Sequence, residues 1–206
     1  MVIREWLSKC PLIAILRGLK PDEVEDVFGG LLDAGIAIAE IPLNSPEPAK
    51  SIRRAIDLYG SRMLIGAGTV TRAAEVEQVR DAGARLVVSP CADAEIVHQA
   101  KLHRMISIPG VGTATEAINM VHAGADALKL FPADVLGIRM MTSLRAILPK
   151  ETLLLPVGGV DEETLPAWRA AGADGYGVGS SIYRPGAKGS EVSAKAWRLI
   201  EVLHHK

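Results

Sequence analysis

The sequence is poor in cysteine and contains no long apolar run, and each shortage excludes a class of protein. Its 206 residues include two cysteines, Cys10 and Cys91, whose spacing is not that of metal ligands, and we interpret both as ordinary thiols. No apolar stretch approaches the roughly 18 residues that a membrane-spanning helix needs. The run at residues 11–16 is too short, and too closely flanked by charge, for a secretory signal. We therefore predict a cytoplasmic protein that has no membrane partner.

The chain also lacks an excess of charge of either sign. Lys and Arg number 23 and Asp and Glu number 24, so no overall basic field favours nucleic acid or anionic lipid. The five histidines show no pattern of partners that would indicate a metal site. We therefore expect no nucleic-acid partner, no metal and no cofactor. Any binding of anions must be local.

The sequence does contain a regular alternation of short apolar runs and longer segments of helical periodicity. Nearly every helical segment ends in an Ala-Gly pair, which is typical of a left-handed glycine that closes a helix just before a strand. We predict eight strands, at residues 12–16, 37–43, 63–69, 85–89, 105–109, 127–131, 153–157 and 175–179.

Eight strands that are each followed by a helix predict an α/β fold. Near-continuous apolar strands joined by helices are typical of a parallel sheet, and eight such units match a closed (β/α)₈ TIM barrel at the short end of its size range. A doubly wound open sheet is the alternative. No linker or change of composition divides the chain, so we predict one domain over residues 1–206, with a short helix within residues 1–10 across the barrel floor.

A lysine lies in the middle of an apolar strand, in Ala127-Leu128-Lys129-Leu130-Phe131. Burying an ammonium group is costly, and desolvation would lower the pKa of Lys129 from about 10.4 toward ~7–8. A neutral amine is a nucleophile for ketones. The alternative is a lysine whose stem packs in the core while its charged end reaches water.

Glu40 lies in a similar apolar strand. Side chains alternate along a strand, so Lys129 points into the barrel if Leu128 and Leu130 face the helices, and Glu40 does so if Ile41 packs outward. An amine and a carboxylate that share one cavity suit imine chemistry, in which the nitrogen is the electron sink and the acid moves protons. A plain salt bridge between Glu40 and Lys129 is the alternative.

Other candidates lie at strand ends, where a barrel gathers its chemistry. Arg17 follows the first strand, and its guanidinium could hold a carboxylate or form a rim salt bridge. Thr69 ends a Gly-Ala-Gly-Thr segment whose small residues let a ligand approach the backbone, although glycines at a barrel corner look similar. The strongest anion signal is the pair of glycine-containing loops at residues 157–159 and 177–181, where barrels often bind phosphate.

Together these segments closely resemble the 2-keto-3-deoxy-6-phosphogluconate and phosphogalactonate aldolase family, class I aldolases built on a (β/α)₈ barrel. The resemblance runs over about residues 11–186 and rests on Leu128-Lys129-Leu130-Phe131-Pro132 and Glu40-Ile41-Pro42-Leu43. It implies that Lys129 forms the imine, that Glu40 transfers protons, that the substrate is a sugar-acid phosphate and that the assembly is a homotrimer. It also implies that Arg17 and Thr69 hold the pyruvyl carboxylate, that Pro90 and Phe131 line the cavity, and that phosphate is bound by Gly158, Gly159, Gly179 and Ser180.

Two features favour the phosphogalactonate branch of that family. Phosphogluconate enzymes typically carry Thr just before the Gly-Gly pair and a Glu-Val-Thr-Leu-Arg-like second strand, whereas this chain has Val157 and Glu40-Ile41-Pro42-Leu43-Asn44-Ser45-Pro46. A hydroxyl at position 157 could bond one C4 epimer and not the other, although neutral drift would also explain a valine. The resemblance thus implies cleavage of 2-dehydro-3-deoxy-6-phospho-D-galactonate to pyruvate and D-glyceraldehyde 3-phosphate. The alternatives are a 2-dehydro-3-deoxy-6-phosphogluconate aldolase and a non-catalytic barrel that binds a sugar phosphate.

Overall fold

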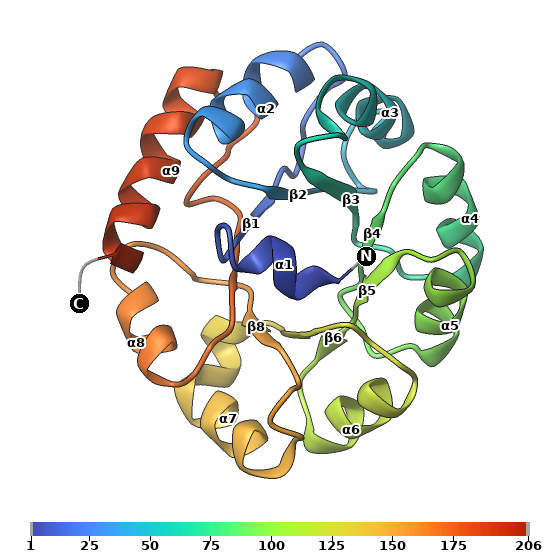
Figure 1. Ribbon diagram of the computed structural model, residues 1–206, viewed down its shortest axis with the longest axis vertical. Helices are drawn as coiled ribbons and strands as arrows, with labels where there is room; N and C mark the ends of the chain where they lie inside the picture. Colours follow the sequence, from blue (N-terminus) through green and yellow to red (C-terminus); the bar gives the residue numbers. More distant parts are fainter. Residues whose placement is uncertain (1, 205–206) are drawn as a thin grey trace.

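Parallel strands lie inside a ring of helices in the computed structural model of the protein (Figure 1). The structure describes residues 2–204, so Met1, His205 and Lys206 lie outside the description, although the predictions above included them. The strands are β1 (Leu12–Ile15), β2 (Ile38–Pro42), β3 (Leu64–Gly68), β4 (Leu86–Val88), β5 (Ile106–Ile108), β6 (Gly110–Val111), β7 (Leu128–Leu130), β8 (Leu154–Pro156) and β9 (Tyr176–Val178). The helices are α1 (Ile3–Leu7), α2 (Val24–Asp33), α3 (Pro48–Tyr59), α4 (Ala73–Asp81), α5 (Ala94–Leu102), α6 (Ala114–His122), α7 (Ala133–Ile147), α8 (Leu165–Ala170) and α9 (Gly189–His204).

Each predicted strand contains an observed strand, and only the fifth differs in kind. Within residues 106–111 the strand is interrupted at Pro109, which has no N–H to donate to a neighbour, so β5 and β6 are separate. The prediction that the glycine of an Ala-Gly pair closes each helix is confirmed at Gly35, Gly83 and Gly124, which have left-handed φ values of 88°, 91° and 90°. Local sequence signals were therefore sufficient to predict where the helices end and the strands begin.

All strand pairs are parallel, and they form two curled sheets. The larger has the order β5-β4-β3-β2-β1-β9 and the smaller the order β6-β7-β8. The register places Glu40 opposite Gly66 and Ile15, and it places Lys129 opposite Gly110 and Leu155. The predicted α/β fold with a parallel sheet covered by helices is confirmed, and Figure 1 shows the helices on the outer side of the curled sheet.

The amino end of the strands is closed by α1, as the sequence predicts. Ile3 and Leu7 of α1 belong to an apolar cluster with Ile13, Ile38 and Leu64, which lie at or near the start of their strands. In Figure 1, α1 crosses the middle of the ring. This packing leaves the opposite, carboxyl ends of the strands for a binding site, as is usual for parallel strands followed by helices.

The outer layer of apolar side chains packs between the strands and the helices. It includes the fully buried Leu128 and Leu130 of β7 and Ile41 of β2. These are the neighbours that the alternation argument required to face the helices. None of the helices within residues 2–204 has both the length and the apolar character that crossing a membrane would take.

Candidate active site

Lys129 and Glu40 face the same small cavity between the strands. Both side chains are deeply buried, with exposed fractions of 5% for Lys129 and 2% for Glu40. The remaining wall is apolar or without a side chain and consists of Ile13, Ile15, Val88, Ile108, Leu155, Val157 and Gly177. The interpretation of Lys129 as a lysine whose charged end reaches water is therefore wrong.

Burial moves the pKa values of both groups toward neutrality. It raises the pKa of Glu40 to about 7, although the positive charges of Lys129 and Arg17 act in the opposite direction. The pKa of Lys129 is lowered, chiefly by desolvation; the Glu40 charge opposes this shift and Arg17 adds to it. The two groups form no direct ion pair, and Glu40 Oε2 has no hydrogen-bond partner within the described chain. The alternative considered from the sequence, a salt bridge between Glu40 and Lys129, is therefore not formed.

A glycine in the neighbouring strand makes room for the Glu40 carboxyl group. A Cβ at Gly68, at the end of β3, would overlap with both carboxylate oxygens and with Cδ of Glu40. Any larger residue would have to displace the acid. The Gly-Ala-Gly segment therefore has a definite steric purpose, which sequence reasoning had assigned only to the approach of a ligand or to a barrel corner.

Phe131 lies beside the amine. The Lys129 Nζ atom is 4.4 Å from the centroid of the Phe131 ring, a distance at which the ring face attracts a cation. The ring lines a second, larger cavity and is not part of the wall of the cavity that holds Lys129 and Glu40. Phe131 thus lines part of the site, and its role at the substrate stays a prediction.

Arg17 is held by the loop that follows β2. Its Nη1 atom donates a hydrogen bond of 2.7 Å to Asn44 Oδ1, and the N–H of Gly18 donates one of 3.0 Å to Ser45 Oγ. Arg17 makes no salt bridge with a carboxylate in residues 2–204, so the rim salt bridge considered above is not formed. The guanidinium lies close enough to Glu40 and Lys129 to affect the pKa of both.

The second cavity, of about 330 Å³, is formed by the two glycine-containing loops, and we call it the outer cavity. Its volume is at the lower end of the range for small-molecule sites. It shares Ile15, Val157 and Gly177 with the cavity of Lys129 and Glu40, so the two adjoin. Its lining consists of Ile15, Arg17, Phe131, Val157, Gly158, Gly159, Val160, Asp161, Gly177, Gly179, Ser180, Ser181 and Arg184.

Two predicted residues do not line either cavity. Thr69 lies one residue beyond β3, with a left-handed φ of 57° that is uncommon for threonine. Pro90 lies two residues beyond β4, and its backbone packs against Gly110, the residue opposite Lys129. Both stand at the carboxyl ends of strands, but neither side chain is part of a cavity wall.

Asn44 and Arg184 are among the polar residues of the site that escaped prediction. Asn44 was visible only as part of a motif, and nothing local to it indicates that it binds Arg17. Arg184 lies four residues beyond Ser180, and a cation so near a predicted phosphate loop is the signal that could have identified it. The presence of both residues in the site depends on how loops that are distant in the sequence approach one another.

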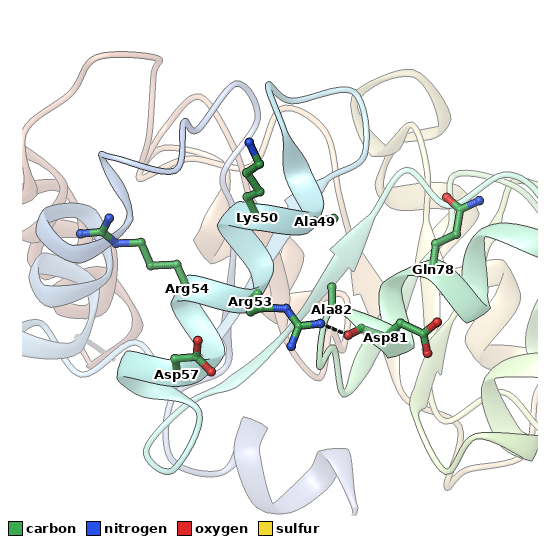
Figure 2. Close-up of a pocket in the computed structure, with 8 residues that line it drawn as sticks. All are labelled: Ala49, Lys50, Arg53, Arg54, Asp57, Gln78, Asp81 and Ala82. Atoms are coloured by element: carbon green, nitrogen blue, oxygen red, sulfur yellow. Dashed lines mark hydrogen bonds between the residues drawn. The ribbon is translucent and has the colours of Figure 1, made fainter.

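A separate groove lies on the outside of the ring, between α3 and α4. Figure 2 shows its charged side chains, among them Arg53, which donates a hydrogen bond to the backbone oxygen of Asp81. It contains none of the candidate residues. In residues 2–204 no cluster of three or more His, Cys, Asp or Glu side chains is arranged to hold a metal ion.

Comparisons with known proteins agree with this arrangement. Residues 3–198 match the family model described as KDPG and KHG aldolase. The chain is 46% identical over 186 residues to a probable 2-dehydro-3-deoxy-6-phosphogalactonate aldolase of Rhizobium meliloti (strain 1021), covering 90% of this chain and 88% of that protein. It is 42% identical to the 2-dehydro-3-deoxy-6-phosphogalactonate aldolase of Escherichia coli (strain K12), covering 96% of each. A solved structure described as native KDPGal superimposes with a TM-score of 0.92 at 41% identity, covering 95% of each chain.

Proposed function

Because this chain belongs to the KDPG and KHG aldolase family, we propose that it cleaves 2-dehydro-3-deoxy-6-phospho-D-galactonate reversibly to pyruvate and D-glyceraldehyde 3-phosphate. The observation that carries the proposal is the pair of Lys129 and Glu40, buried in one cavity without a direct ion pair. The choice of substrate is supported by the names of the two relatives and by Val157, which lines both cavities.

The reaction begins with the amine. Neutral Lys129 attacks the C2 ketone, and loss of water gives a protonated imine, which is the electron sink. Glu40 takes the proton of the C4 hydroxyl as the C3–C4 bond breaks, so that D-glyceraldehyde 3-phosphate leaves and an enamine remains. Glu40 then returns a proton to C3, and hydrolysis of the new imine frees pyruvate and the lysine. A carboxyl group with a pKa of about 7 can serve as base and acid in turn near neutral pH.

The remaining residues hold the two ends of the substrate. The guanidinium of Arg17 binds the carboxylate next to C2, a role that is supported by its electrostatic effect on both Lys129 and Glu40. The phosphate occupies the outer cavity, on the backbone of the loops with Gly158 and Gly179. Thr69 and Pro90 retain their roles at the carboxylate and at the cavity edge only through the family resemblance.

We also propose that the strands form a single closed eight-stranded barrel in one domain. A parallel bridge between Val157 and Gly177 supports contact of β8 with β9, and the N–H of Lys129 donates a 2.9 Å hydrogen bond to Pro109 between β5 and β6. Counting β5 and β6 as one interrupted strand gives eight. The assembly is proposed to be a homotrimer, as the family resemblance implies, and its mass in solution tests this.

A coupled assay for pyruvate released from each C4 epimer tests the function. We expect kcat/KM to be at least about tenfold higher for the galactonate epimer than for the gluconate epimer. Val157→Thr, which adds a hydroxyl without a large change in volume, should narrow this ratio. A preference for the gluconate epimer would favour the phosphogluconate aldolase instead. Release of pyruvate from neither, with phosphate still bound, would indicate a non-catalytic barrel.

A further inference from the structure

One cation of the outer cavity has no part in the mechanism so far. Arg184 lines this cavity together with the two glycine-containing loops, and its side chain makes no ion pair or hydrogen bond within residues 2–204. Arg17, the other arginine of the cavity wall, is different. It is bonded to Asn44 and acts on the pKa values of Lys129 and Glu40, whereas Arg184 is not among the groups that influence either.

The backbone that carries Arg184 is held firmly on both sides. Tyr183 is 3% exposed, and its N–H donates a 2.9 Å hydrogen bond to the carbonyl oxygen of Gly179 in the glycine-containing loop at residues 177–181. Pro185 packs against Gly18, where a Cβ would lie 2.7 Å from its Cγ. The position of Arg184 is thus determined by its neighbours, while its own charged group remains exposed and available.

One carboxylate lines the outer cavity and another lies close to Gly158 in its wall. Asp161 is part of the wall, and its pKa is lowered chiefly by the hydrogen bond from the backbone of Thr164, so it stays ionised. Asp134 Oδ1 would lie 3.0 Å from a Cβ at Gly158. A phosphate dianion in this cavity is near the negative charge of Asp161, and the guanidinium of Arg184, which lines the same cavity, can offset this repulsion.

We propose that Arg184 binds the phosphate group of the substrate and makes the enzyme selective for phosphorylated over unphosphorylated sugar acids. This inference rests on the proposed function, and it adds a binding residue from the loop after β9. The planar guanidinium can donate two parallel hydrogen bonds to phosphate oxygens, which a lysine cannot reproduce. Arg17 is left for the carboxylate at the other end of the substrate.

Two activities of the same enzyme test the inference, because only one involves a phosphate. For Arg184→Ala we expect KM for the phosphorylated substrate to rise about 10- to 100-fold, and the inhibition constant of inorganic phosphate to rise by a similar factor. Proton exchange at C3 of pyruvate uses Lys129 and Glu40 but no phosphate, so it should change far less. Arg184→Lys should fall between the native enzyme and Arg184→Ala. Arg198→Ala, at an exposed position of α9 outside the cavity, is the matched control and should behave as native.

The outcomes separate this inference from the proposed function. A KM within twofold of native in Arg184→Ala would overturn it, as would an equal loss of cleavage and exchange, which would place the effect at the reacting centre or on the fold. Absence of cleavage in the native enzyme would instead refute the proposed function, while direct titration of native protein and Arg184→Ala with inorganic phosphate would still decide whether Arg184 binds this anion.

Discussion

Replacing Glu40 by glutamine should make the protein more stable and less active. The native carboxyl group is 2% exposed, and one of its oxygens has no hydrogen-bond partner within the described chain. Its ionised form is therefore poorly solvated, and its pKa is raised from 4.5 to about 7. Glutamine has nearly the same shape as the neutral acid and never ionises.

The magnitude follows from the difference in pKa between the folded and unfolded states. Each pKa unit corresponds to about 1.4 kcal/mol, so ionised Glu40 destabilises the folded state by roughly 3 kcal/mol. The pKa of Glu40 is higher in the folded state than in the unfolded state. The free energy of unfolding therefore begins to fall as pH rises above 4.5, and the fall is complete once pH exceeds about 7. The advantage of Glu40→Gln should thus grow by roughly 2–3 kcal/mol between pH 5 and pH 8, which corresponds to several degrees in Tm.

Thermal and urea unfolding of both proteins at pH 5 and pH 8 measure this difference. Glu77→Gln, at an exposed position of α4, is the matched control and should stay within about 0.5 kcal/mol of native at both pH values. Glu40→Gln should also slow proton exchange at C3 of pyruvate. Two results would show that Glu40 is not held in a dry environment. One is equal stability of Glu40→Gln and native protein at pH 8, and the other is an increase in the free energy of unfolding of Glu40→Gln that is as large at pH 5 as at pH 8.

Three further substitutions test the site. Lys129→Ala should retain the fold, as seen by circular dichroism, and lose at least about 10³-fold in cleavage; unimpaired turnover would reject the imine mechanism. Gly68→Ala should displace the Glu40 carboxyl group and slow proton exchange about 100-fold, at a stability cost of about 1–3 kcal/mol in urea unfolding; exchange at the native rate would refute the steric role of Gly68. Asn44→Ala should release Arg17 and raise KM for pyruvate in the exchange reaction about 2- to 10-fold with kcat little changed, and a fall in kcat alone would contradict its positioning role.

The strands, the helix ends and the direction of the two buried ionisable groups could be predicted because their signals are local. Apolar runs separated by Ala-Gly pairs mark the boundaries of the elements, and alternation along a strand places Lys129 and Glu40 in the interior. The glycine-containing loops at residues 157–159 and 177–181 line the outer cavity, and that they bind phosphate stays a prediction.

The remaining features depend on contacts between segments that are far apart in the sequence. The hydrogen bond from Arg17 to Asn44 joins two loops, and Gly68 makes room for a side chain of the neighbouring strand. Thr69 was assigned to the pyruvyl carboxylate by the family resemblance, but one residue beyond a strand the alternation no longer determines where a side chain points. The interruption at Pro109 follows from its missing N–H, a local signal that was overlooked.

Reduction with borohydride in the presence of pyruvate tests the central claim most directly, namely that Lys129 is a neutral nucleophile in a dry cavity. We predict irreversible loss of activity and one pyruvate-derived mass on the peptide that contains Lys129, with no such mass in Lys129→Ala. The same mass on a different peptide, or full activity after reduction, would contradict the account.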